Sequence, residues 1–104
     1  MVKVRVISRK ALRTFAERHP EAGAPLGAWF KLASHCAARN LAELKQTFAS
    51  VDLVRIGSRD FFVFNIEGNK YRLVAAIHFD AQRLFVRRLM THPEYSKELW
   101  KKAI

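Results

Sequence analysis

The sequence is poor in the residues that form disulfides, thiolate metal sites and flexible loops. Its 104 residues include one cysteine, four glycines and three prolines. The single cysteine, Cys36, excludes an internal disulfide and every zinc site built from several thiolates. It falls in an apolar helical stripe, so we expect it to pack in the core of a protein from a reducing compartment.

Acidic residues are also scarce. Nine Asp and Glu stand against 19 Lys and Arg, which gives a formal charge of +10. An excess of this size favours a polyanionic partner such as a nucleic acid, a membrane surface or an acidic protein. A soluble basic protein without such a partner is the plainer alternative.

Targeting segments and metal or nucleophile motifs are missing as well. Residues 1–7 alternate charged and apolar side chains without the apolar core of a signal peptide, and no segment is long enough to cross a membrane. We therefore expect a cytoplasmic protein that does not contact membranes. His19, His35 and His78 have no metal-ligand spacing, and neither a glycine-rich phosphate loop nor Gly-x-Ser-x-Gly occurs, so we expect no metal and no cofactor.

The hydrophobic pattern changes from helical to strand-like near Ser50. Before it, Val2, Val4 and Val6 predict a strand. Three helices are then expected: one from Ser8 to His19-Pro20, one over residues 26–37, and one capped by Asn40 and Glu43. Strands are expected at residues 51–56, 61–66, 70–79 and 83–91, separated by turns at 57–60, 67–69 and 80–82.

A closing helix is expected from Pro93 to about Lys102, with Tyr95, Leu99 and Trp100 as its apolar residues. The order of elements predicts one α+β domain over residues 1–104. In it, helices pack on one face of a mainly antiparallel sheet.

Counting along the last predicted hairpin indicates which side chains meet. With a three-residue loop, Phe79 faces Arg83, which places Lys70 opposite His92, Arg72 opposite Met90 and Arg88 opposite Val74. Because strand side chains alternate, Lys70, Arg72, Arg88 and His92 share one exposed face, and Tyr95 follows nearby. The opposite, core-side face receives Tyr71, Leu73, Ile77, Phe79, Phe85 and Leu89.

Each of these residues also has a simple structural explanation. Basic residues on an open sheet face are usually just solvated, and a His near a strand end often caps a turn. Tyr95 can be a core aromatic with its hydroxyl at the surface. Arg87 falls on the core-side face, where its stem would pack and its guanidinium would pair with a carboxylate.

Two segments of the chain read Phe-Asn-Ile-x-Gly-Asn-Lys-Tyr-Arg-Leu-Val at Phe64–Val74 and Val-Arg-x-x-x-Thr-His-x-Glu-Tyr at Val86–Tyr95. Both closely resemble the HigB toxins of the RelE superfamily. The likeness extends in order over nearly the whole chain, through Val6–Leu12, His19-Pro20, Pro25-Leu26, Trp29, Leu44-Lys45, Phe48, Ser50 and Asp52. It departs at residues 35–40, where many relatives carry a basic stretch that contains Trp.

The resemblance implies a compact RelE-like fold and the toxin of a type II toxin–antitoxin system. Such a toxin is an mRNA interferase that cuts mRNA on the translating 70S ribosome and arrests growth. A helix-turn-helix antitoxin neutralises it, and we expect the complex of the two to bind its own operator DNA.

The resemblance and the register together predict the site residues. Arg72 and Lys70 would stabilise phosphate charge, His92 would act as general acid or base, and Tyr95 would stack on a base or share proton transfer. Further RNA contacts are predicted at Asn69, Thr91, Arg88, Lys45 and Lys97. Two alternatives stay open: a non-catalytic RNA- or DNA-binding module that uses the same face, and an inactive toxin kept as a partner of its antitoxin.

Overall fold

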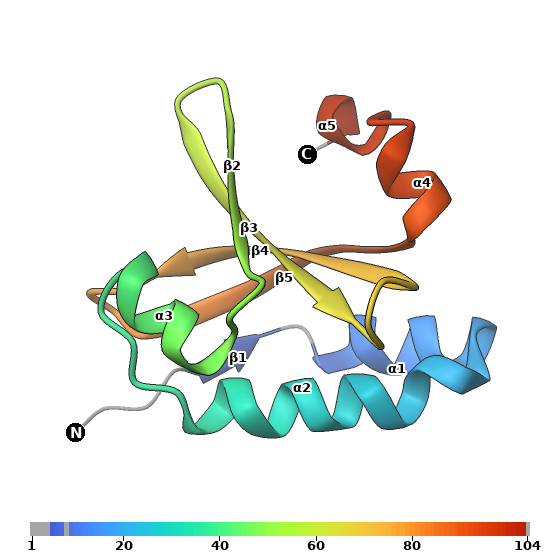
Figure 1. Ribbon diagram of the computed structural model, residues 1–104, viewed down its shortest axis with the longest axis horizontal. Helices are drawn as coiled ribbons and strands as arrows, with labels where there is room; N and C mark the ends of the chain where they lie inside the picture. The colour runs from blue at the N-terminus through green and yellow to red at the C-terminus, as the bar shows by residue number, and fades with distance from the viewer. Residues whose placement is uncertain (1–4, 8, 104) are drawn as a thin grey trace.

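One five-stranded sheet organises the molecule (Figure 1). The computed structural model describes residues 5–7 and 9–103. The strands are, in chain order, β1 (Arg5–Ile7), β2 (Asp52–Ile56), β3 (Arg59–Ile66), β4 (Tyr71–His78) and β5 (Arg83–Thr91). They lie in the order β1-β5-β4-β3-β2, with β1 parallel to β5 and the other neighbours antiparallel. The predicted α+β class is confirmed, whereas Val2, Val4 and Ser8 lie outside the described residues.

Three helices cover one face of this sheet: α1 (Arg9–Arg18), α2 (Gly23–His35) and α3 (Leu41–Thr47). α1 ends where predicted, because His19 precedes Pro20 and takes an extended φ of −128° before a short 3₁₀ turn at Pro20–Ala22. Their apolar stripes and one face of the strands form the first core, which includes Phe15, Leu26, Trp29, Leu44, Phe64, Tyr71 and Leu73. The predicted packing of the N-terminal helices on one face is thus confirmed.

Two details of these helices differ from expectation. α2 ends at His35 rather than Ala37, and Cys36 follows it in extended conformation but is buried as predicted. The Asn40 side chain caps α3 by accepting from the Glu43 amide at 2.9 Å. The Glu43 carboxylate does not complete the predicted capping box, because it accepts instead from the backbone and guanidinium of Arg39.

A second, smaller core covers part of the opposite face of the sheet. It consists of Phe61, Val63, Val74, Met90 and Trp100, with Tyr95 packed against it. Two short helices, α4 (His92–Ser96) and α5 (Trp100–Ala103), bring the last two of these residues there. Figure 1 shows them above the sheet, while α1 and α2 lie below it. The face predicted to be exposed is therefore partly covered, and Arg72 on it is only 7% exposed.

The prediction of a single closing helix is wrong, because two short helices, α4 and α5, stand in its place. The chain leaves the helical conformation between α4 and α5, where Glu98 adopts a left-handed φ of 60°. This break turns Trp100 back onto the sheet and leaves Leu99 exposed, so that Leu99 does not contribute to a core as predicted. The predicted turn at 57–60 is also shorter, because Arg59 and Asp60 already pair in β3.

The last hairpin confirms the predicted pairing at the end that carries the candidate site. Arg72 faces Met90, Val74 faces Arg88, and the His92 amide donates to the Lys70 carbonyl at 2.9 Å. The loop itself has four residues, 79–82, because His78 already faces Arg83. A β-bulge at Arg87 supplies one extra residue on β5 and so restores the predicted partners beyond it.

Because the loop has four residues, the pairing of the first half of β5, residues 83–86, differs by one residue from the prediction. Phe85 faces Ala76 and makes an edge-to-face contact with His78, so it lies on the face opposite to the predicted one. Leu84 and Val86 take the core-side positions instead.

Within the described residues, no helix combines the length and apolar character that a bilayer crossing requires.

Candidate functional site

A polar hollow of about 420 Å³ opens on the face of the sheet that carries the second core. Its walls come from four parts of the chain: α3 with the following turn, strands β2 and β3, strand β4, and α4. The residues that line it are Lys45, Ala49, Ser50, Val51, Asp52, Val63, Asn65, Arg72 and Tyr95. We call this the Arg72 hollow.

Arg72 is the buried cation of the hollow. Its guanidinium donates to the carbonyls of Asn69, at 3.3 Å, and Tyr71, at 3.2 Å, and to the Asn69 side-chain oxygen. These acceptors are neutral, and no carboxylate lies within ion-pair distance of Arg72 in the part of the chain that the structure describes. A buried charge with only neutral partners is costly, so an anion in the hollow would compensate it.

Tyr95 forms the aromatic wall beside this cation. The Arg72 guanidinium lies 5.6 Å from the centre of the Tyr95 ring, and the Tyr95 ring also stacks on Trp100 at 5.3 Å between ring centres. The Trp100 indole N–H donates to the Tyr95 carbonyl at 3.2 Å, which fixes the stack. Burial raises the pKa of the Tyr95 hydroxyl, and the negative charge of Asp52 raises it further. The hydroxyl is therefore protonated and a hydrogen-bond donor at neutral pH.

Three polar residues of the hollow were not predicted as site residues: Ser50, Asp52 and Asn65. Asn65 faces Arg72 across the β3–β4 ladder, and Asp52 faces Val63 across the β2–β3 ladder. Pairing counted across the β3–β4 hairpin would have found Asn65 only with the correct loop, since Lys70 belongs to the turn and not to the strand. Asp52 lies in the family-like sequence, but nothing in the local pattern marks a carboxylate at a strand start as functional.

The other predicted residues around the hairpin end lie outside this lining. Lys70 is an exposed turn residue whose ammonium lies 3.9 Å from Glu67. His92 begins α4, and its Nδ1 is buried without a hydrogen-bond partner among the described residues. Thr91 caps α4 in a complete capping box with Glu94, and hydrogen bonds from Thr91 lower the pKa of that carboxyl. The structure therefore joins Arg72, Tyr95 and Lys45 and leaves Lys70, His92 and Thr91 beside them.

Arg88 and Lys97 meet in a different hollow of about 340 Å³, between β5 and the α4–α5 segment. Met90, Glu94 and Trp100 also line it. Trp100 lines this second hollow and stacks on Tyr95, which lines the first. Asn69, by contrast, contacts the site directly through its hydrogen bonds with Arg72.

Arg87 lies at the bulge and is half-buried. The predicted ion pair is not formed, since no carboxylate of residues 5–7 or 9–103 lies within ion-pair distance of it. Across the same residues, no group of three His, Cys, Asp or Glu side chains is placed to hold a metal ion.

Comparison with known proteins identifies the family of this chain. Residues 22–98 match the HigB toxin family, described as a RelE-like toxic component of a toxin–antitoxin system. The mRNA interferase toxin HigB of Escherichia coli K12 is 33% identical over 90 residues, which covers 86% of each chain. The mRNA interferase HigB of Shigella flexneri matches equally, and that of Escherichia coli CFT073 is 24% identical over 92 residues and 88% of each chain. The matched residues include every part of the Arg72 hollow, and the chain belongs to the HigB family of RelE-like toxins of toxin–antitoxin systems.

Proposed function

We propose that this toxin is an mRNA interferase, an endoribonuclease that cuts mRNA on the translating ribosome and so stops growth. Membership of the HigB family and the names of its relatives support the activity. The observation that carries the proposal is the Arg72 hollow, in which a buried guanidinium without an anionic partner lies against a protonated tyrosine.

The reaction requires no group that the chain lacks. The 2′-hydroxyl of one nucleotide attacks the adjacent phosphorus, the bond to the 5′-oxygen of the next nucleotide breaks, and a cyclic phosphate and a 5′-hydroxyl remain. Catalysis needs in-line positioning, charge stabilisation on the five-coordinate phosphorus, a proton acceptor for the 2′-hydroxyl and a donor for the leaving oxygen.

Arg72 supplies the charge stabilisation. Its guanidinium is held by Asn69 and the Tyr71 carbonyl, so it reaches the phosphate already oriented. Lys45 lies on the rim of the same hollow and holds a neighbouring phosphate, and Lys70 does so at the hairpin end.

Proton transfer is divided between the groups near this phosphate. Tyr95 is protonated at neutral pH and donates, and its ring offers a stacking surface for a splayed base. His92 beside the hairpin end and the Asp52 carboxylate in the hollow are the proton acceptors to be tested. Thr91, Arg88 and Lys97 lie along the β5–α4 side, where they contact the RNA backbone of mRNA or ribosome.

The partners follow from the family. The toxin has an antitoxin as partner, and we propose that it is a helix-turn-helix protein, that the two bind their operator DNA together, and that the free toxin acts in the cytoplasm on mRNA held by 70S ribosomes.

A translating extract tests this function. Adding the purified toxin is expected to produce new mRNA ends within codons, with cyclic phosphate or 3′-phosphate termini on the upstream fragment. The Arg72→Ala/His92→Ala double variant is expected to lose this cutting while it still binds its antitoxin. Unchanged cutting by that variant would reject the site. Salt-dependent RNA binding without any new ends in the wild type would support the non-catalytic alternative instead.

A further inference from the structure

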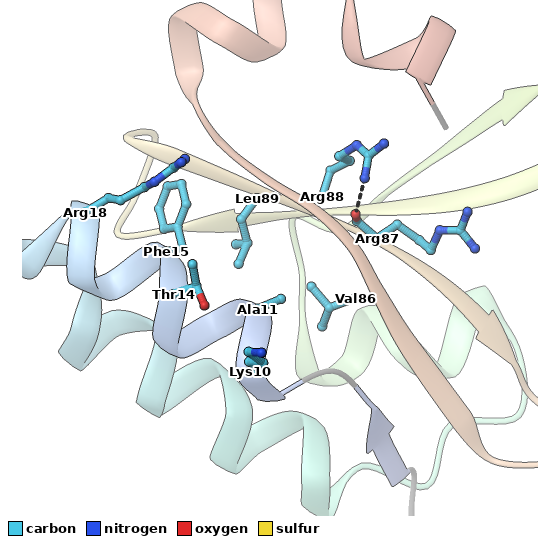
Figure 2. A pocket seen from close by; sticks show the side chains of 9 residues that line it. All are labelled: Lys10, Ala11, Thr14, Phe15, Arg18, Val86, Arg87, Arg88 and Leu89. Carbon is cyan, nitrogen blue, oxygen red and sulfur yellow. Dashed lines mark hydrogen bonds between the residues drawn. The ribbon is translucent and has the colours of Figure 1, made fainter.

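A second depression lies on the opposite face of the sheet, between α1 and β5. It has a volume of about 510 Å³ and is lined by one side of α1, from Lys10 to Arg18, and by residues 86–89 of β5 (Figure 2). We call it the α1–β5 groove. None of the residues assigned to the Arg72 hollow lines it.

The edge of β5 is open along this groove. β1 pairs with Arg83, Leu84 and Phe85, but β5 continues to Thr91, and no other described strand pairs with it on that side. Four consecutive residues of β5 line the groove, although alternate side chains of a strand point to opposite faces. The groove is therefore bordered by the strand edge itself, and an open edge of this kind is a frequent site of protein binding.

The groove combines an apolar floor with a cationic rim. Ala11 and Phe15 of α1 face Val86 and Leu89 of β5 across the floor, as Figure 2 shows. Lys10, Arg18 and Arg87 stand around it, and none of the nine residues that line the groove is acidic. Arg87, the extra residue at the bulge, is one of the residues that line this groove.

The floor is suited to protein side chains and not to nucleotide bases. Phe15, the aromatic residue of the lining, is only 8% exposed. Its ring is covered by His19, stacked at 4.5 Å, and by Tyr71, edge-on at 5.5 Å. A base would find no free aromatic face to stack on, whereas aliphatic side chains of a partner would pack against Ala11, Val86 and Leu89.

We propose that the α1–β5 groove binds an acidic segment of the antitoxin, whose apolar side chains pack on the floor while its carboxylates pair with the rim. The inference rests on the family's toxin–antitoxin relation and adds the position and chemistry of the contact. Because the groove and the Arg72 hollow lie on opposite faces of the sheet, the antitoxin holds the toxin here without entering the hollow.

The test measures the affinity of purified toxin variants for the cognate antitoxin, together with mRNA cutting in a translating extract. The Lys10→Glu/Arg87→Glu variant is expected to bind at least about tenfold more weakly at 0.15 M salt, since it reverses two rim charges. Thr14→Trp fills the groove without a change in charge, and we expect a similar loss. Both variants are expected to cut mRNA as the wild type does.

A matched control reverses two arginines on the same elements outside the groove. Arg13 lines a depression on the other side of α1, and Arg83 is exposed at the start of β5. Arg13→Glu/Arg83→Glu is expected to keep the affinity within about threefold. Thermal unfolding of each variant confirms that it is folded.

Three outcomes would overturn the inference: wild-type affinity in both groove variants, an equal loss in the control, or lost mRNA cutting with unchanged antitoxin affinity, which would assign the groove to RNA. A wild-type toxin that cuts no RNA while the groove variants lose the antitoxin would reject the proposed function and leave this contact supported.

Discussion

At the scale of single residues, Arg72 shows how the fold prepares a cation for an anion. The sheet buries the side chain, and the Asn69–Tyr71 backbone orients its guanidinium, but no acidic residue neutralises it within the described part of the chain. A lysine has a charge of the same sign but cannot donate to several acceptors in one plane.

Arg72→Lys is therefore expected to reduce the rate of RNA cutting by about 10²–10³-fold, the usual effect of losing one aligned donor to a transition state. The rate is measured as mRNA cleavage in a translating extract. Arg83→Lys makes the same exchange at an exposed position of β5 and serves as the control. Equal activity of the two variants would show that charge alone, without orientation, is sufficient at position 72.

A second residue pair links α1 and α2 to the sheet through one hydrogen bond. The Tyr71 hydroxyl donates to Glu21 Oε1 at 2.6 Å beside the rings of Phe15 and His19. This bond raises the pKa of Tyr71 from its ordinary value of 10.0 to about 12 and lowers the pKa of Glu21. The bond is therefore complete only while Tyr71 is protonated and Glu21 is ionised.

Tyr71→Phe is expected to remove a pH dependence as well as stability. In the wild type, the contribution of Tyr71 is present below pH 10 and is lost as the pH rises toward 12, because its folded-state pKa is the higher one. The contribution of Glu21 is present above its ordinary pKa of 4.5 and is lost as the pH falls through its lowered value. Urea unfolding midpoints of both proteins from acid to alkaline pH measure this, and parallel curves would contradict it.

At the scale of elements, the sequence predicts the sheet better than it predicts the connections. The pattern of apolar residues predicts the positions of β3, β4 and β5 correctly, because each of these strands buries apolar side chains against at least one of the two cores. The loop at 79–82 was predicted one residue too short, and the bulge at Arg87 was not predicted. The two errors cancel beyond Val74, so Arg72 and Met90 pair as expected.

The parts that the sequence did not predict depend on contacts between distant segments. Nothing in the pattern of residues 92–103 shows that Glu98 leaves the helix, whereas in the structure this break accompanies the packing of Trp100 into one cluster with Met90 and Val74. The Arg72 hollow likewise needs α3, β2, β3 and α4 brought together around Arg72 of β4, and local periodicity carries no information about that arrangement. Asp52 was missed for this reason, whereas Asn65 was missed because the predicted turn between β3 and β4 was one residue too short.

Deleting Arg87 tests the bulge. Ala75 already faces Val86 and Val74 already faces Arg88, so removal of the residue between them keeps both registers and every face assignment. We expect the deletion to fold cooperatively with a loss of roughly 1–3 kcal/mol in the free energy of unfolding.

Deleting Leu89 is the contrasting change. It turns the buried Met90 and the residues after it to the wrong face, and we expect no cooperative thermal transition. If neither deletion variant shows a cooperative thermal transition, the interpretation of Arg87 as a single extra residue in β5 is wrong.

At the scale of the whole molecule, the formal charge is +10, but only some of the cations border the Arg72 hollow. Neutralisation of a cation that contacts an RNA phosphate lowers the salt dependence of binding by about 0.7 in the slope of log K against log salt for single strands. A cation elsewhere leaves this slope unchanged.

Lys45→Gln is accordingly expected to reduce the slope by about 0.7, and Lys31→Gln, an exposed change on α2, is expected to leave it as in the wild type. Binding is measured by fluorescence anisotropy on a single-stranded RNA with 2′-O-methyl groups, which the toxin cannot cut. Equal slopes for the two variants would place Lys45 away from the bound strand.

The position of the Tyr95–Trp100 stack in the chain order has a consequence for synthesis. The ribosome adds both rings after β4 and Arg72, so a chain that ends before residue 95 has no aromatic wall beside the guanidinium. On the proposed role of Tyr95, we expect RNA cutting to begin only after α4 and α5 are complete and docked. On the same assignment, a chain still under synthesis has no complete site, and we expect only completed molecules to cut RNA.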